Sequence, residues 1–122
     1  MYLRGANSTD TDAALNLWRI AEATESVTDT ADDIRRMSAR ESVAFILAIV
    51  DDTVVGSIIA TFDGWPGNMY RLATHPDYRR KGIARAVVGE SEKVFTGWGV
   101  RRITALVEKD HPWAVQFWQS AG

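Results

Sequence analysis

The sequence lacks cysteine altogether and contains only two histidines, His75 and His111, among its 122 residues. This scarcity excludes disulfide bonds, thiolate zinc sites and thiol nucleophiles, and a metal site built from several imidazoles is not expected. Long apolar runs are also missing, because residues 43–50 form the longest one and fall far short of the ~20 residues that cross a bilayer. Residues 1–4 open no signal-peptide pattern. We therefore expect a soluble, cytoplasmic protein with no metal site and no membrane partner.

The chain as a whole has little net charge, −2 at pH 7 with a pI near 5.6, which argues against a nucleic-acid partner. Its two halves differ, however. Residues 1–61 carry five arginines against ten acidic residues, whereas residues 62–122 carry nine basic residues against six acidic ones. Four of the latter cations fall within seven residues, and this cluster predicts a local anion-binding site: Arg79, Arg80, Lys81 and Arg85.

Length and composition predict one domain that spans residues 1–122, because no repeat and no linker rich in proline or serine divides the chain. The order β-α-α-β-β-β-α-β-α indicates a mixed α/β (α+β) fold in which antiparallel hairpins precede a strand–helix–strand crossover. The predicted elements are a strand at 1–5, a helix capped by Thr9 or Asp10, a helix at 30–39, strands at 44–50, 53–62 and 68–74, a helix from 83 to 97 or 99, a strand at 103–107 and a helix from 112.

Local patterns support these elements. Four apolar residues recur at the spacing of one buried helix face: Ala14, Leu17, Trp18 and Ala21. Asp51-Asp52 joins two β-branched runs and predicts a two-residue hairpin turn, whose type stays open because glycine is absent. Pro76 ends the strand before it, since proline cannot donate to a ladder.

The basic segment 79–85 lies between a predicted strand and the helix that begins near Ile83. A glycine at such a junction, here Gly82, lets backbone N–H groups approach a ligand, and a helix start carries a partial positive charge of ~0.5. The sequence contains neither a Walker phosphate loop nor a G-x-G-x-x-G dinucleotide motif. The segment therefore predicts a phosphate-binding turn with its own cations, and the plain alternative is a solvated basic turn.

Residues 72–84, Leu-Ala-Thr-His-Pro-Asp-Tyr-Arg-Arg-Lys-Gly-Ile-Ala, resemble the acetyl-CoA signature Q/R-x-x-G-x-G/A of the GNAT family of N-acetyltransferases. Arg79, Gly82 and Ala84 match its three fixed positions. Residues 107–122 look like the strand and helix that follow in that family. Order and spacing agree along the whole chain, so the resemblance implies a GNAT-like mixed, mostly antiparallel sheet flanked by helices.

The resemblance further implies an enzyme that uses acetyl-CoA as its acyl donor. A strand edge would pair with the pantetheine arm as if that arm were an added strand, and the basic turn would hold the pyrophosphate. The donor-binding residues implied in this way are Leu72, Ala73 and Thr74 on the strand, and Arg79, Arg80, Lys81, Gly82, Ile83, Ala84 and Arg85 in the turn.

The implied reaction is direct acetyl transfer to a primary amine of a small molecule, a peptide or a protein. Many family members have a tyrosine that protonates the leaving thiolate, but Trp118 stands at that position here, and an indole N–H does not titrate usefully. The candidates for proton transfer are Tyr70, Glu108 and His111, with Asp110 as a further one. This departure keeps an alternative open, a CoA- or acyl-CoA-binding module with impaired catalysis.

A second departure concerns the C-terminal end. Family members usually continue past Gly122 through a final strand, so we expect a sheet that lacks this strand. An uncovered strand edge invites pairing with another chain, which suggests a homodimer formed by strand exchange.

Overall fold

The computed structural model describes residues 1–21, 31–40, 42–62, 64, 67–100 and 102–105. Two short 3-10 turns accompany the main elements. The strands are β1 (Tyr2–Gly5), β2 (Val43–Val50), β3 (Thr53–Phe62), β4 (Gly67–Thr74) and β5 (Ile103–Ala105); the helices are α1 (Thr11–Ile20), α2 (Ala31–Ser38) and α3 (Ile83–Trp98); the turns are η1 (Ser8–Asp10) and η2 (Pro76–Tyr78). The predicted order is confirmed as far as β5, while residues 106–107 of the last predicted strand and the helix predicted from residue 112 lie outside the described residues.

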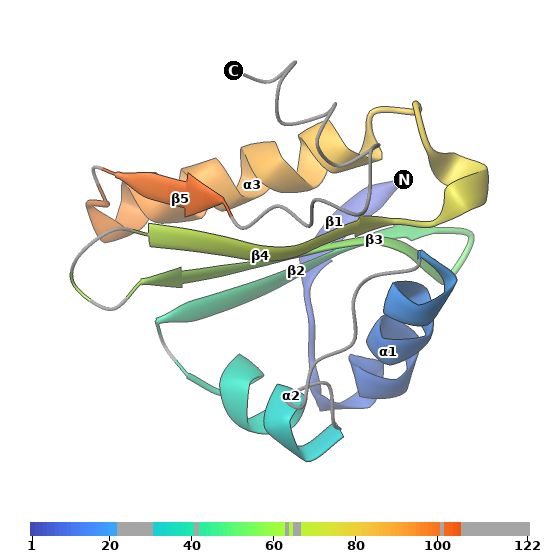
Figure 1. The fold of residues 1–122 in the computed structure, drawn as a ribbon, viewed down its shortest axis with the longest axis horizontal. Helices are drawn as coiled ribbons and strands as arrows, with labels where there is room; N and C mark the ends of the chain where they lie inside the picture. The colour runs from blue at the N-terminus through green and yellow to red at the C-terminus, as the bar shows by residue number, and fades with distance from the viewer. Residues whose placement is uncertain (22–30, 41, 63, 65–66, 101, 106–122) are drawn as a thin grey trace.

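The five strands form one sheet in the order β1-β2-β3-β4-β5. The first four are antiparallel neighbours, and β5 runs parallel to β4 after the crossover through α3. Figure 1 shows α3 on one side of the sheet and both α1 and α2 on the opposite side. The predicted fold class, a mixed and mostly antiparallel sheet flanked by helices, is therefore confirmed. None of the described helices is both long and apolar enough to cross a membrane.

The α1 side of the sheet is packed by the helix face that the sequence predicts. Ala14, Leu17 and Trp18 within α1, and Ala21 directly after it, are all buried in one apolar cluster. The Trp18 ring stacks on Phe45 of β2, with 5.9 Å between the ring centroids. The burial of this tryptophan therefore fixes α1 against the middle of the sheet.

The start of α1 differs in part from the prediction. Asp10 precedes the helix as expected, but its side chain makes no cap bond with α1. Instead, the Asn7 side chain accepts a hydrogen bond from the Thr9 N–H at 2.9 Å, and the Asp10 carboxylate accepts one from the Asn7 N–H at 2.8 Å. This reciprocal capping box opens η1, so α1 begins only at Thr11.

The α3 side is packed by a second apolar face, formed by Ile83, Val87, Val88 and Phe95. The contact is so close at the start of α3 that a Cβ atom on Gly56 of β3 would lie 2.5 Å from Cγ2 of Ile83. This glycine therefore sets how near the first turn of α3 comes to the sheet. The helix ends at Trp98 and is followed by a left-handed glycine, within the predicted limits.

The β2–β3 hairpin resolves the turn type that the sequence leaves open. Asp51 and Asp52 have φ values of 49° and 61°, so both lie in the left-handed region. Two left-handed residues form the mirror-image turn whose twist matches that of paired strands. Aspartate tolerates this conformation better than most side chains, which explains why the turn forms without glycine.

Candidate functional site

The two halves of β4 have different surroundings. Its first residues, Gly67 to Met69, pair in parallel with β5, and Met69 lies opposite Ala105, the last described residue of β5. From Tyr70 to Thr74, no described strand pairs with β4 on this side. The predicted donor-binding residues Leu72, Ala73 and Thr74 all belong to this second half. Within the described part of the chain, their outer edge is therefore available for pairing with an extended ligand.

A β-bulge that no local sequence pattern predicts follows the first half of β4. Ser57 of β3 faces Ala73, and Ile59 faces Tyr70, so that two residues of β4, Arg71 and Leu72, stand opposite a single residue of β3. Arg71 has a φ of 54°, in the left-handed region that favours glycine. Bulges of this kind bend a strand and redirect the residues that follow. Here the redirected residues are those of the predicted donor edge.

The segment after β4 is a compact turn built on aromatic contacts. The His75 side chain accepts a hydrogen bond at Nδ1 from the Asp77 N–H at 3.2 Å and so caps η2. The His75 ring packs edge-on against Tyr78, with 5.4 Å between centroids. Lys81 Nζ lies 5.3 Å from the centroid of the same tyrosine ring. The turn therefore holds one of its predicted cations in place through a cation–π contact.

The junction with α3 has the geometry that an anion site requires. Arg80 and Gly82 take left-handed φ values of 64° and 81°, and backbone that alternates in this way directs successive N–H groups toward one side. Gly82 precedes the first residue of a 16-residue helix whose first turn contains no acidic residue. Arg80, Lys81 and Arg85 are all exposed around this helix start. A Cβ atom on Gly82 would meet no atom within 4 Å, so the space beside it is open.

A buried hydroxyl adds an independent sign that a ligand fits here. Thr74, the last residue of β4, is 2% exposed, and its Oγ1 has no hydrogen-bond partner among the described residues. A buried polar atom without a partner is costly, and such atoms are uncommon in folded proteins. Together with the open space at Gly82, this hydroxyl makes the end of β4 compatible with a polar, phosphate-bearing ligand.

Two predicted donor-binding residues also have structural roles. Ile83 is buried against the sheet, so only its backbone is available to a ligand. The Arg79 side chain is half-buried, and its Nη2 donates to the carbonyl oxygen of Ala21 at 3.5 Å. Arg79 therefore links the basic turn to the C-terminal end of α1.

Of the predicted proton-transfer residues, the structure describes only Tyr70. Tyr70 lies on β4 immediately before the bulge, where it is partly buried against the α1-side cluster. Glu108, His111 and Asp110 lie outside the described residues, as does Trp118. Among the described residues, no group of three or more histidine or acidic side chains gathers in a way that could hold a metal.

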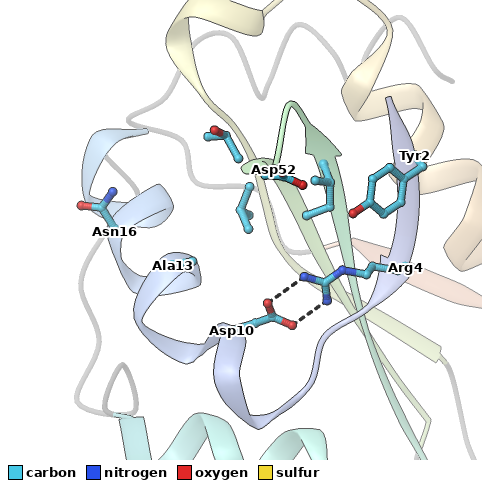
Figure 2. A pocket seen from close by; sticks show the side chains of 9 residues that line it. Tyr2, Arg4, Asp10, Ala13, Asn16 and Asp52 are labelled. Carbon is cyan, nitrogen blue, oxygen red and sulfur yellow. Dashed lines mark hydrogen bonds and ion pairs between the residues drawn. The ribbon is translucent and has the colours of Figure 1, made fainter.

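A hollow of about 340 Å³ lies elsewhere on the molecule, between α1, β1 and the β2–β3 hairpin. Figure 2 shows the side chains that line it. Arg4 and Asp10 line it and form a two-pronged ion pair, with N–O distances of 2.6 and 2.8 Å. The hydrogen-bonded guanidinium lowers the pKa of the Asp10 carboxyl below its usual range. Because this pair also fixes η1 onto β1, its role is structural, and the hollow includes none of the predicted site residues.

Comparisons with known proteins find relatives of this chain in sequence and in fold. The profile of the acetyltransferase (GNAT) family matches residues 12–122. An acetyltransferase of Pectobacterium atrosepticum is 32% identical over 111 residues, which cover 91% of this chain and 79% of that protein. An acetyltransferase of Sodalis glossinidius is 31% identical over 119 residues, or 98% of this chain and 84% of the relative.

Solved structures share the fold at lower identity. The PaiA N-acetyltransferase of Thermoplasma acidophilum, solved with coenzyme A, superposes with a TM-score of 0.89 at 17% identity and covers 99% of this chain and 87% of its own. An aminoglycoside 6′-N-acetyltransferase of Acinetobacter haemolyticus gives a TM-score of 0.84 at 15% identity, with 100% and 90% coverage. At such identities the likeness establishes the fold.

Proposed function

This chain belongs to the acetyltransferase (GNAT) family and is an acetyl-CoA-dependent N-acetyltransferase, and from that premise we propose where it holds its donor and how it uses it. The donor site is the second half of β4 together with the turn that leads into α3. The observation that carries this proposal is the left-handed Gly82, which opens a helix without an acidic first turn. One short turn, which contains η2, separates this helix start from the strand half that no described strand covers.

Each part of the site has a separate task. The backbone of residues 80–85, together with the charges of Arg80, Lys81 and Arg85, binds the pyrophosphate. The edge of Leu72, Ala73 and Thr74 binds the pantetheine arm through main-chain hydrogen bonds. Arg79 keeps the turn attached to α1 through its bond to Ala21. When bound, acetyl-CoA supplies a thioester, which is an activated acyl group.

The acceptor is a primary amine of a small molecule, a peptide or a protein. A lysine-like amine with a pKa of about 10.4 is roughly 99.9% protonated at pH 7, so the site must accept a proton before the nitrogen can attack. Tyr70 is the candidate that the described part of the chain contains. It lies beside the donor edge, because it directly precedes the bulge residue Arg71. Glu108 and His111 remain the other proposed proton-transfer residues. Holding donor and amine side by side supplies much of the remaining acceleration.

Calorimetric titration of the purified chain with acetyl-CoA tests the donor site first. We expect one-to-one binding in the micromolar range, and a folded chain that binds neither acetyl-CoA nor CoA would contradict the proposal. Release of free thiol is then measured with a panel of small amines, aminoglycosides and peptides. Donor binding without thiol release from any acceptor would favour a binding module instead of an enzyme.

A further inference from the structure

Two buried side chains outside the donor site form a hydrogen-bonded relay that ends at the β4 bulge. The indole N–H of Trp18 on α1 donates to Ser57 Oγ on β3 at 3.0 Å. The Ser57 hydroxyl in turn donates to the backbone carbonyl oxygen of Arg71 at 2.7 Å. Trp18 is 4% exposed and Ser57 is 0% exposed, so water does not compete for the bond between them, and the bond to Arg71 is partly buried. We call these two residues the relay.

The relay contacts Arg71, whose backbone is strained. Arg71 carries a side chain in the left-handed region at φ 54°, a conformation that costs an ordinary residue ~1 kcal/mol or more. Its carbonyl is fixed by Ser57, and its guanidinium carbon lies 5.1 Å from the centroid of the Trp18 ring. Both the backbone and the side chain of Arg71 are therefore held by the relay. This arrangement maintains the bulge without glycine.

We infer that Trp18 and Ser57 are positioning residues for the acyl donor, because they fix the bulge that aims the backbone of Leu72, Ala73 and Thr74 toward the open edge of β4. The inference rests on the proposed donor site. A strand that binds an extended ligand must present its N–H and C=O groups in one register, and the bulge sets that register two residues after Met69, the last residue of β4 that pairs with a described residue of β5.

The same helix also contacts the other half of the donor site. Trp18 reaches the bulge, and the carbonyl of Ala21, three residues later, accepts the hydrogen bond of Arg79 from the basic turn. Helix α1 thus fixes the strand half and the turn half of the site relative to each other. Loss of the relay should disturb the strand half while the turn half keeps its own contacts at His75, Tyr78 and Lys81.

The experiment compares Ser57→Ala and Trp18→Phe with the control Ser91→Ala. Ser91 is also 0% exposed, but its hydroxyl contacts the Val88 carbonyl oxygen at 2.7 Å and Met69 Sδ at 3.2 Å, in the half of β4 that pairs with β5, and neither contact involves Arg71 or Leu72 of the bulge. Trp18→Phe keeps an aromatic ring at this position but removes the N–H donor together with part of the ring that faces Arg71. Calorimetry is carried out with two probes, free CoA and adenosine 3′,5′-bisphosphate, which carries phosphates but no pantetheine arm.

Ser57→Ala should weaken CoA binding about tenfold and Trp18→Phe about threefold. The affinity of both variants for the bisphosphate should stay within about twofold of that of the parent chain. Ser91→Ala should bind both probes within about twofold of the parent chain. In the ligand-free protein, the backbone amide NMR signals of residues 71–73 should shift in Ser57→Ala and not in Ser91→Ala. Equal CoA affinities of Ser57→Ala and Ser91→Ala, or a matching loss of bisphosphate affinity, would overturn the inference. Failure of the parent chain to bind CoA would instead contradict the proposed donor site.

Discussion

The two faces of the sheet position the donor site by different physical means. On the α3 face, close packing positions the site, because Ile83 packs against Gly56 so tightly that a Cβ atom there would force its neighbours to shift. On the α1 face, hydrogen bonds position the site, because Ser57, the next residue of the same strand, donates to the carbonyl oxygen of Arg71. Close packing places a whole helix, whereas a hydrogen bond fixes the direction of one peptide group. The position of the basic turn depends on close packing, and the position of the donor edge depends on the hydrogen bond.

Gly82→Asp should produce the largest effect and tests the turn itself. The change forces a side chain into φ 81° and adds a negative charge where phosphate must approach N–H groups, so CoA affinity should fall at least about 100-fold. Calorimetry measures this loss, and circular dichroism checks that the chain remains folded. The matched control is Gly97→Asp, at the exposed far end of α3, where a Cβ atom also meets nothing within 4 Å. Unchanged affinity in a folded Gly82→Asp chain would refute the phosphate-binding turn.

Gly56→Ala tests the close packing on the α3 face. The added methyl group would lie 2.5 Å from Ile83 Cγ2 and 3.2 Å from Ala48 Cβ, so the start of α3 must move away from the sheet. We expect a loss of about 1 to 3 kcal/mol in the free energy of unfolding, measured in urea, and weaker CoA binding.

Gly67→Ala is the matched comparison at the other end of the helix. Its Cβ would lie 2.5 Å from Cε1 of Phe95, so the destabilisation should be similar, but Phe95 is remote from the turn along α3. CoA affinity should therefore remain close to that of the parent chain once the folded fraction is taken into account. Equal losses of CoA affinity in the two variants would show that Gly56 acts through general stability.

The contrast between the faces also explains what the sequence could predict. The basic turn is encoded locally: Pro76, Gly82 and the cations lie within ten residues and specify a strand end, a left-handed residue and a helix start. The apolar face of α1 is encoded by spacing, and its burial is confirmed. These features need no knowledge of distant contacts.

The bulge is different because no residue near Arg71 signals it. The carbonyl that defines it is held by Ser57, fourteen positions away, and Ser57 is held by Trp18, a further thirty-nine positions away. The one available signal was a serine in the middle of the apolar strand 53–62, since a buried hydroxyl must find a partner. The cap at Asn7 was missed for a similar reason, because its bonds depend on how η1 folds back.

Asp10→Asn tests whether hydrogen bonds at the beginning of α1 matter as much as packing. The substitution removes the charge that accepts two bonds from Arg4, whose side chain is 35% exposed, while that of Asp10 is 10% exposed. We expect a loss of about 1 kcal/mol in unfolding free energy, smaller than that of Gly56→Ala, because solvent screens the guanidinium. CoA affinity should not change, since the pair is not part of the donor site. A destabilisation larger than that of Gly56→Ala would mean that hydrogen bonds at the beginning of α1 stabilise the fold more than close packing at Gly56 does.

The smallest expected effect is the pH dependence of this ion pair. The Arg4 guanidinium lowers the pKa of Asp10 in the folded chain below the ordinary value of 3.8. A carboxyl with a lowered folded-state pKa stabilises the fold fully above its unfolded pKa, and that contribution disappears as the pH falls through the folded pKa. Urea unfolding of the parent chain and of Asp10→Asn, measured from pH 7 down to pH 2, should therefore give a constant difference above about pH 5 that shrinks below about pH 4. A difference that stays constant to the lowest pH would mean that the charge of Asp10 contributes nothing and that only the shape of its cap matters.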